Sequence, residues 1–179
     1  MKILLHSCCS PCAAHPIKEL ISEGYQVTLF YYNPNIHPKS EYTARLGELS
    51  AYLGKIPGVG IIEGEYEDKK WFEQMKGLER EPERGKRCDK CYEMRLGKTA
   101  EMARSNGYDS FGSTLSISPH KKAIKISEIG NKLASEFGVE FFDRDWKKLD
   151  GFKKSCDIAR NEDFYRQDYC GCSYSKKVE

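Results

Sequence analysis

The sequence predicts an α/β fold: a mostly parallel five-stranded sheet with helices on both faces, and a carboxyl-terminal helix and tail that fold over its active edge. Two observations predict it. Short apolar or β-branched runs alternate with segments whose apolar residues recur at helical spacing. The first run is followed at once by the cysteine-rich turn HSCCSPC. Alternation of this kind implies right-handed crossovers between parallel strands, within one domain that spans 1–179.

Strands and helices alternate in the amino-terminal half. Residues 2–5 (KILL) are an apolar run typical of a buried strand, and apolar residues within 13–21 then mark one face of a helix. The β-branched and aromatic run 26–32 (QVTLFYY) predicts the second strand. A helix within 42–53 and a third strand at 59–62 follow. The cysteine-rich turn is therefore expected at the carboxyl end of a strand, where ligands bind in open parallel sheets.

The same alternation continues toward the carboxyl terminus. Apolar spacing predicts helices around 71–75 and 92–103, and YDSFGS at 108–113 predicts the fourth strand. A helix within 126–137 leads to the fifth strand at 139–142.

A last helix is predicted after Asp150, with Phe152, Cys156 and Ala159 aligned on one face. On that apolar side, Cys156 is expected to behave as a small core residue. The tail DYCGCSYSKKVE is too short to be a domain, but by folding back over the sheet edge it would bring its cysteines to the others.

Composition limits the compartment and the partners. The net charge of +2 excludes a polycation that binds any nucleic acid by charge alone. No signal peptide is recognised and no apolar run is long enough to span a bilayer, so we expect a cytoplasmic protein without a membrane partner. Thiols stay reduced there, and the eight cysteines therefore point to metal binding or redox chemistry.

Two cysteine motifs provide four metal ligands. The C-x-x-C of Cys88 and Cys91 opens a predicted helix, so both sulfurs lie on one face. Together with the adjacent Cys8 and Cys9 they suit tetrahedral zinc or a cubane iron–sulfur cluster. Adjacent cysteines chelate one ion poorly, which favours the cluster. The role of Cys12 is undecided: it is a ligand of a second metal, or it is only packed against its neighbours.

The third motif, Cys170-Gly171-Cys172, differs in kind. A bridge across one glycine is strained and easily reduced, which describes a redox couple better than a structural disulfide. The alternative is that both cysteines are additional metal ligands.

Other polar residues at the presumed active edge are candidates with ordinary alternatives. His6 orients a thiolate or substrate, or is a hydrogen-bonded core histidine. The loop after the fourth strand holds substrate through its side chains or caps the next helix; the candidates are Ser113, Thr114, Ser116 and His120. Basic runs at 84–87, 121–122, 153–154 and 176–177 are solvated faces or a phosphate-binding patch, with Lys121 and Lys122 nearest to the loop.

Four motifs in order, HSCCSPC, CDKCYEMRL, GSTLSISPHK and QDYCGC, resemble the cobalamin-independent epoxyqueuosine reductase family, QueH. The resemblance covers nearly the whole chain. It implies the last step of queuosine synthesis, in which the epoxide oxygen of epoxyqueuosine is removed at the tRNA wobble position. It also implies that a 4Fe-4S cluster is held by Cys8, Cys9, Cys88 and Cys91. By the same resemblance, Cys170 and Cys172 are a redox-active disulfide pair.

The scaffold is similar to the Rossmann-like, PP-loop ATP pyrophosphatases that modify tRNA. Their glycine-rich phosphate loop is replaced here by HSCCSPC, so we expect no ATP, and the resemblance implies no cobalamin. We also expect an additional iron near Cys12. The reaction further needs an electron donor, which the sequence does not identify. Proton delivery is expected from His6, Asp168 or Tyr169, which lie near cysteines in the sequence. The alternatives are a zinc-stabilised RNA-binding module and an iron–sulfur tRNA-thiolation enzyme of the PP-loop type.

Overall fold

The computed structural model describes residues 1–176. Its strands are β1 (Lys2–His6), β2 (Gln26–Tyr31), β3 (Gly60–Glu63), β4 (Ser110–Ser113) and β5 (Glu140–Phe141). They form one sheet in the order β3-β2-β1-β4-β5, and every neighbouring pair is parallel. The predicted α/β fold with a five-stranded parallel sheet is therefore confirmed.

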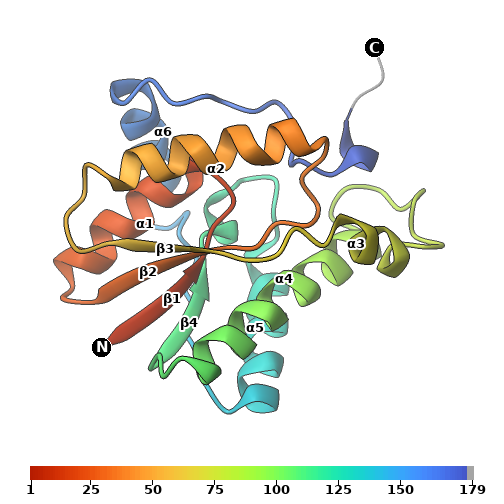
Figure 1. Cartoon of the computed structure of the whole chain (residues 1–179), viewed down its shortest axis with the longest axis horizontal. Helices are drawn as coiled ribbons and strands as arrows, with labels where there is room; N and C mark the ends of the chain where they lie inside the picture. The colour runs from red at the N-terminus through yellow and green to blue at the C-terminus, as the bar shows by residue number, and fades with distance from the viewer. Residues whose placement is uncertain (177–179) are drawn as a thin grey trace.

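Helices cover both faces of this sheet (Figure 1). On one face α1 (Ser10–Ser22) packs against α2 (Lys39–Leu53) and α6 (Gly151–Asn161). On the other face α4 (Lys86–Ser105) packs against β1, β4 and α5 (Ala123–Phe137). The crossovers from β1 to β3 and those from β3 to β5 thus use opposite faces. Within the described residues, no helix is both long and apolar enough to cross a membrane.

The burial of β1 in the core explains why its sequence is a continuous apolar run. Ile3, Leu4 and Leu5 are all fully buried, because the central strand of a parallel sheet is covered on both sides. At the sheet edge, Gly130 brings α5 against β5: a Cβ there would stand 2.3 Å from the ring of Phe141. The helix can approach this strand only with a glycine at that position.

The strand order places a ligand-binding crevice at the carboxyl end of β1. The chain leaves β1 toward β2 on one side, and β4 flanks β1 on the other, so the connections diverge at this point. Backbone pairing aligns His6 with Ser113. The HSCCSPC turn follows directly, at the switch point of the sheet.

The tail crosses the same edge, as predicted. It follows α6, runs alongside α2, where it contacts Glu48 and Arg45, and ends in a short 3-10 turn, Ser173–Ser175, beside α3 (Asp68–Gln74) (Figure 1). The backbone N–H of His37 donates to the carbonyl of Gly171 at 2.8 Å. Cys172 is buried against Trp71.

The predicted orientation of α6 is only partly correct. Ala159 is buried, but Phe152 is 41% exposed and Cys156 is half-buried, so Cys156 is not the core residue we expected. Small residues bring α6 against α1, where the hydroxyl of Ser155 donates to the carbonyl of Pro11. Phe152 and Cys156 are thereby turned toward a cavity rather than the core.

Candidate functional site

Three cysteines gather where β1 turns into α1. The sulfurs of Cys8, Cys9 and Cys12 all lie within 4.8 Å of one another, and those of Cys8 and Cys9 are 3.8 Å apart. Cys9 caps the amino end of α1 in an extended conformation, and Pro11 stands in the first turn, where a missing N–H costs nothing. The turn therefore projects three sulfurs into one space.

The cysteines of this group share their protons unequally. Hydrogen bonds from Cys12 and Cys9 hold the pKa of Cys8 well below its usual range, and the positive charges of Lys121 and Arg95 act in the same direction. The hydrogen bond to Cys8 raises the pKa of Cys12. Without a metal, Cys8 is thus the thiolate of the group, and soft anionic sulfur is the donor that iron and zinc prefer.

The other four motif cysteines surround a second, smaller cavity of about 30 Å³. Cys88 and Cys91 enter it from the first two turns of α4, and Cys170 and Cys172 enter it from the tail. The tail therefore brings its cysteines to the C-x-x-C motif, as predicted. The backbone N–H of Arg84 donates to the sulfur of Cys88 at 3.3 Å.

Two cations connect the cysteine groups. Arg95 is buried on α4. Burial alone would lower its pKa, but the charges of Cys91 and Cys8 outweigh this effect, and the pKa is raised above its usual value. Lys121 lines the second cavity, and its charge acts on Cys8, Cys12 and Cys170. Arg95 was not among the residues predicted for the site. Its signal was the spacing, since it follows Cys91 by one helical turn and shares its face.

His6 is a buried, neutral residue that holds Arg95. Burial, then the charge of Arg95, lowers the pKa of His6 to about 3. Nε2 of His6 lies 3.3 Å from the Nε of Arg95 and 3.2 Å from the carbonyl oxygen of Tyr32, and Nδ1 lies 3.3 Å from the hydroxyl of Ser113. Arg95 also donates to the amide oxygen of Asn33 at 2.7 Å. These contacts favour the orienting role over the expected proton delivery.

The two tail residues expected to deliver protons lie apart from the cavities. Asp168 is exposed, and the hydroxyl of Tyr169 donates to the backbone carbonyl of His37. Neither side chain lines a cavity together with cysteines. Proton delivery by these residues stays a prediction.

Cys170 and Cys172 form a thiolate–thiol pair in the reduced protein. The hydrogen bond from Cys172 lowers the pKa of Cys170 to about 5 against the effect of burial, with further support from Ser175, whose Oγ is 3.0 Å from the sulfur. The same hydrogen bond raises the pKa of Cys172. One nucleophilic thiolate beside one thiol is the arrangement found in dithiol redox couples.

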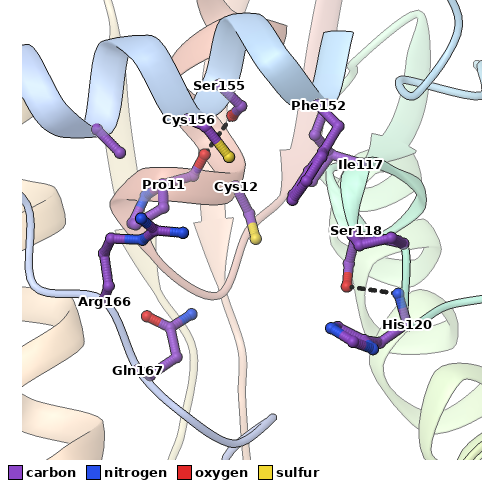
Figure 2. A pocket seen from close by; sticks show the side chains of 12 residues that line it. Pro11, Cys12, Ile117, Ser118, His120, Phe152, Ser155, Cys156, Arg166 and Gln167 are labelled. Carbon is purple, nitrogen blue, oxygen red and sulfur yellow. Dashed lines mark hydrogen bonds between the residues drawn. The ribbon is translucent and has the colours of Figure 1, made fainter. Parts of the chain in front are cut away.

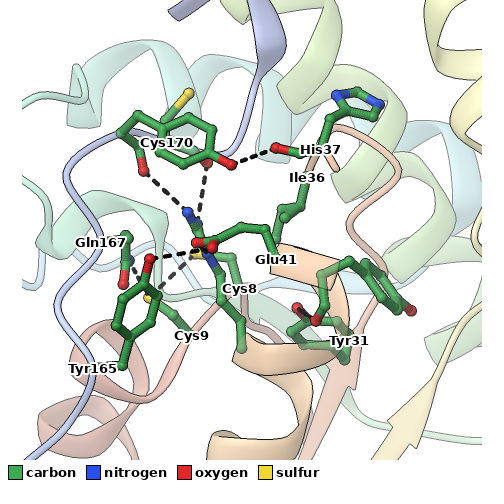
Figure 3. A network of polar contacts seen from close by, with 12 residues as sticks. Cys8, Cys9, Tyr31, Ile36, His37, Glu41, Tyr165, Gln167 and Cys170 are labelled. Carbon is green, nitrogen blue, oxygen red and sulfur yellow. Dashed lines mark hydrogen bonds and ion pairs between the residues drawn. The ribbon is translucent and has the colours of Figure 1, made fainter. Parts of the chain in front are cut away.

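A buried arginine of α2 fixes the tail. Figure 3 shows the tail residues Gln167 and Cys170 near Cys8 and Cys9 and near Glu41 of α2. Arg45 is paired with Glu41 and donates to the backbone carbonyls of Tyr169 at 3.2 Å and Cys170 at 3.4 Å. Nearer to the start of the tail, Nε2 of Gln167 donates to the sulfur of Cys9 at 3.0 Å. No motif in the sequence indicated either contact.

The hydroxyls of Ser113 and Ser116 bond to the backbone, whereas that of Thr114 is buried without a partner among the described residues. Ser113 accepts from the backbone N–H of Leu115 at 3.1 Å, but no side-chain hydrogen bond caps the 3-10 turn Leu115–Ile117 or α5, so the capping alternative is wrong. Ser116 donates to the carbonyl of Arg144 at 2.8 Å, and Thr114 is fully buried. None of the three lines a cavity beside the cysteines, so the structure does not favour the substrate contacts we expected of them.

The basic runs separate into buried and free cations. Arg87 is buried and binds the backbone carbonyls of Leu78 and Glu79, and Arg84 binds those of Pro119 and His120. These arginines hold loops together rather than offering free charge. The exposed lysines of the runs are Lys86, Lys122, Lys153, Lys154 and Lys176. Lys177, the last residue of the predicted patch, lies outside the described residues.

A larger cavity of about 190 Å³ adjoins the first cysteine group (Figure 2). Cys12 lies in its wall beside Cys156 and Phe152 of α6. His120 lines the opposite side, and Gln167 of the tail closes the end nearest to Cys9.

Comparisons with known proteins agree with this arrangement. The family model described as epoxyqueuosine reductase QueH matches residues 3–178. Proteins named epoxyqueuosine reductase QueH from Haemophilus influenzae and Histophilus somni are each 41% identical over 97% of this chain, and the matches cover 71% and 72% of those proteins.

A solved structure shares the fold. The structure titled as a predicted subunit of a tRNA methyltransferase from Methanocaldococcus jannaschii superposes with a TM-score of 0.54 at 15% identity, covering 89% of this chain and 74% of that one. At this identity the likeness concerns the fold alone. The family match and the relatives go further: the chain belongs to the epoxyqueuosine reductase QueH family.

Proposed function

We propose that this protein reduces the epoxide of epoxyqueuosine at the wobble position of tRNA to the alkene of queuosine. Both carbon–oxygen bonds of the epoxide break, a carbon–carbon double bond forms, and two electrons and two protons release the oxygen as water. The carrying observation is that seven cysteines converge on one sheet edge, four of them around a single cavity. The names of the relatives support the substrate.

The donor set fits a 4Fe-4S cluster. We assign its ligands to Cys8, Cys9, Cys88 and Cys91, and leave Cys12 for an additional iron. Arg95 is buried and its charge acts on both Cys91 and Cys8, so together with the half-buried Lys121 it would offset the negative charge that thiolates and a cluster bring to this edge. When bound, the cluster supplies electrons to the substrate.

The chain's own residues supply the rest of the chemistry. Oxidation of the Cys170 thiolate and the Cys172 thiol to a disulfide releases two electrons and one proton, and the second proton that the epoxide oxygen needs to leave as water comes from solvent. The lowered pKa of Cys170 keeps it as the thiolate that attacks or leaves in such exchange. Arg45 holds the backbone of this pair against α2, beside the C-x-x-C motif.

The test combines metal analysis with nucleoside analysis. Protein purified without oxygen should contain iron and sulfide and should convert epoxyqueuosine in tRNA to queuosine, measured by mass spectrometry of the digested nucleosides. Serine at Cys8, Cys9, Cys88 or Cys91 should abolish both, because a hydroxyl is a poor ligand for iron–sulfur clusters. Cys156→Ser, a matched change of a half-buried cysteine, should retain the metal. Colourless protein that holds only zinc would overturn the proposal and support an RNA-binding module.

A further inference from the structure

The 190 Å³ cavity between α1, α6 and the tail is open to solvent and ends at the Cys8–Cys9–Cys12 group. One water molecule needs only about 15 Å³ of such space, so the cavity has room for a larger ligand. Figure 2 shows the ring of Phe152 on one side, and His120 and Arg166 directed toward the space. A group that enters this cavity would approach the sulfur of Cys12.

The walls offer a stacking face and unused polar groups. Phe152 is 41% exposed at the cavity. Within residues 1–176, the guanidinium of Arg166 and the ring of His120 form no hydrogen bond. Gln167 donates to Cys9 through Nε2, while its Oε1 is buried with no partner among those residues. An aromatic face with free donors and acceptors around it is how proteins bind an unstacked base.

The turn that leads into α6 directly precedes Phe152 of the cavity wall. Leu149 and Asp150 both adopt left-handed backbone conformations, with φ of 52° and 61°, which non-glycine residues rarely do. Gly151 fixes the turn, since a Cβ there would stand 1.8 Å from the carbonyl oxygen of Trp146. The result is a rigid turn that presents Leu149 to solvent with 83% of its surface exposed.

Free positive charge surrounds this apolar tip. Lys148 precedes it, and Lys153 and Lys154 follow on α6; all three are exposed. None of them joins the ion pairs found among the described residues, in contrast to Lys125 and Lys132 of α5. Unpaired lysines around a projecting leucine are complementary to a phosphate backbone whose bases are being separated.

We propose that this cavity receives the wobble nucleoside after it has left the anticodon stack, with Phe152 against the face of the base. Leu149 enters the anticodon loop beside the vacated position, and Lys148, Lys153 and Lys154 contact the flanking phosphates. The inference rests on the proposed function and locates its substrate. It also explains how a group inside an RNA loop reaches buried sulfurs: the nucleoside moves, as in other enzymes that act on bases.

Photo-crosslinking tests the location without relying on turnover. The probe is an anticodon stem–loop RNA with 4-thiouridine at the wobble position, irradiated with the metal-loaded protein and mapped by mass spectrometry. Crosslinks are expected in the peptides that contain His120, Phe152 or Gln167. Phe152→Ala should reduce the affinity for the stem–loop about tenfold, the scale of one base–aromatic stack. Ile21→Ala is the control, because Ile21 is also 41% exposed but lies at the far end of α1.

The outcomes separate this inference from the proposed function. If wild-type protein converts epoxyqueuosine but crosslinks elsewhere, and Phe152→Ala and Leu149→Ala bind as tightly as Ile21→Ala, the cavity assignment is wrong and the function stands. If the crosslinks fall in the cavity but epoxyqueuosine is never reduced, the proposed function fails and the RNA site stands. Unchanged iron and sulfide in the variants shows that the site has remained folded.

Discussion

The amide of Gln167 donates to the sulfur of Cys9 across 3.0 Å, although the two residues lie 158 positions apart. Hydrogen bonds to ligand sulfurs stabilise the reduced, more negative state of an iron–sulfur cluster. Gln167→Leu should therefore shift the midpoint potential of the loaded protein to more negative values, as measured by a spectroscopic redox titration. Glu162→Gln, which removes only a surface pair with Lys55, should leave the potential unchanged. Equal potentials in the wild type and Gln167→Leu would show that this bond does not tune the cluster.

Cys170 and Cys172 should cycle between dithiol and disulfide. After one turnover without external reductant, wild-type protein should show the loss of two hydrogens in its terminal peptide by mass spectrometry. Cys172→Ala should keep its iron and sulfide but lose multiple turnover. A pair that stays reduced in the trapped protein would mean that all electrons arrive through the cluster.

Arg45 should matter for the position of that pair. Arg45→Lys retains a cation beside Glu41 but cannot reach both carbonyls of Tyr169 and Cys170 with a planar fork. We expect normal cluster content, tenfold or more slower multiple turnover on the scale of about 1.4 kcal/mol, and faster alkylation of Cys170 as the tail loosens. Arg160→Lys, on the exposed side of α6, is the control and should match the wild type in all three measurements.

The buried His6 should make the protein sensitive to acid. Its pKa is about 3 in the folded state but near 6.5 in an unfolded chain, so between these values the unfolded state binds the extra proton. The free energy of unfolding should fall as the pH drops through this window, by up to about 1.4 kcal/mol per pH unit. His6→Asn removes this contribution, so its denaturant-unfolding curves should show a shallower pH dependence. Parallel dependences in the two proteins would contradict the assignment.

Binding of tRNA should be sensitive to salt. Each lysine that contacts a phosphate contributes about 0.7 to 0.9 to the slope of log affinity against log salt. Lys153→Gln combined with Lys154→Gln should lower the slope by roughly two such contributions. Lys98→Gln, which changes a lysine already paired with Glu101, should preserve it. A slope that is the same in all proteins would place the phosphates elsewhere.

The centre of the sheet was predictable because β1, β2 and β4 are largely buried. Residues 2–5 and 26–32 read as uninterrupted apolar or β-branched runs, and helical spacing marked the crossovers between strands. The spacing of apolar residues predicted the buried face less well in a helix that has two non-polar faces. In α6, small residues such as Ser155 and Ala159 allow close packing on α1, so the larger Phe152 is left at the cavity.

The cysteine motifs were visible in the sequence, but the residues that govern them were not. Nothing in the sequence distinguishes Arg95 and Arg45 from surface arginines. Only the fold shows that both are buried, Arg95 beside the cysteines and Arg45 against the tail. Conversely, Ser113 and Ser116 lie at the predicted active edge of the sheet, but their hydroxyls are hydrogen-bonded to the backbone. Distance in the sequence conceals such partners, because they form only when separate crossovers meet.

The position of β1 in the middle of the sheet also has a consequence for folding. β1 joins β2 through a short, local crossover, whereas its other neighbour pairs His6 with Ser113, 107 positions along the chain. Closing a loop of that length is entropically costly, so the β1–β2–β3 half is expected to form first and to wait for β4. The cysteine pair on α4 arrives with that second half. During synthesis, the nascent chain is therefore expected to expose its first three thiols before the cysteines of α4 are in place, and the proposed cluster would be inserted late.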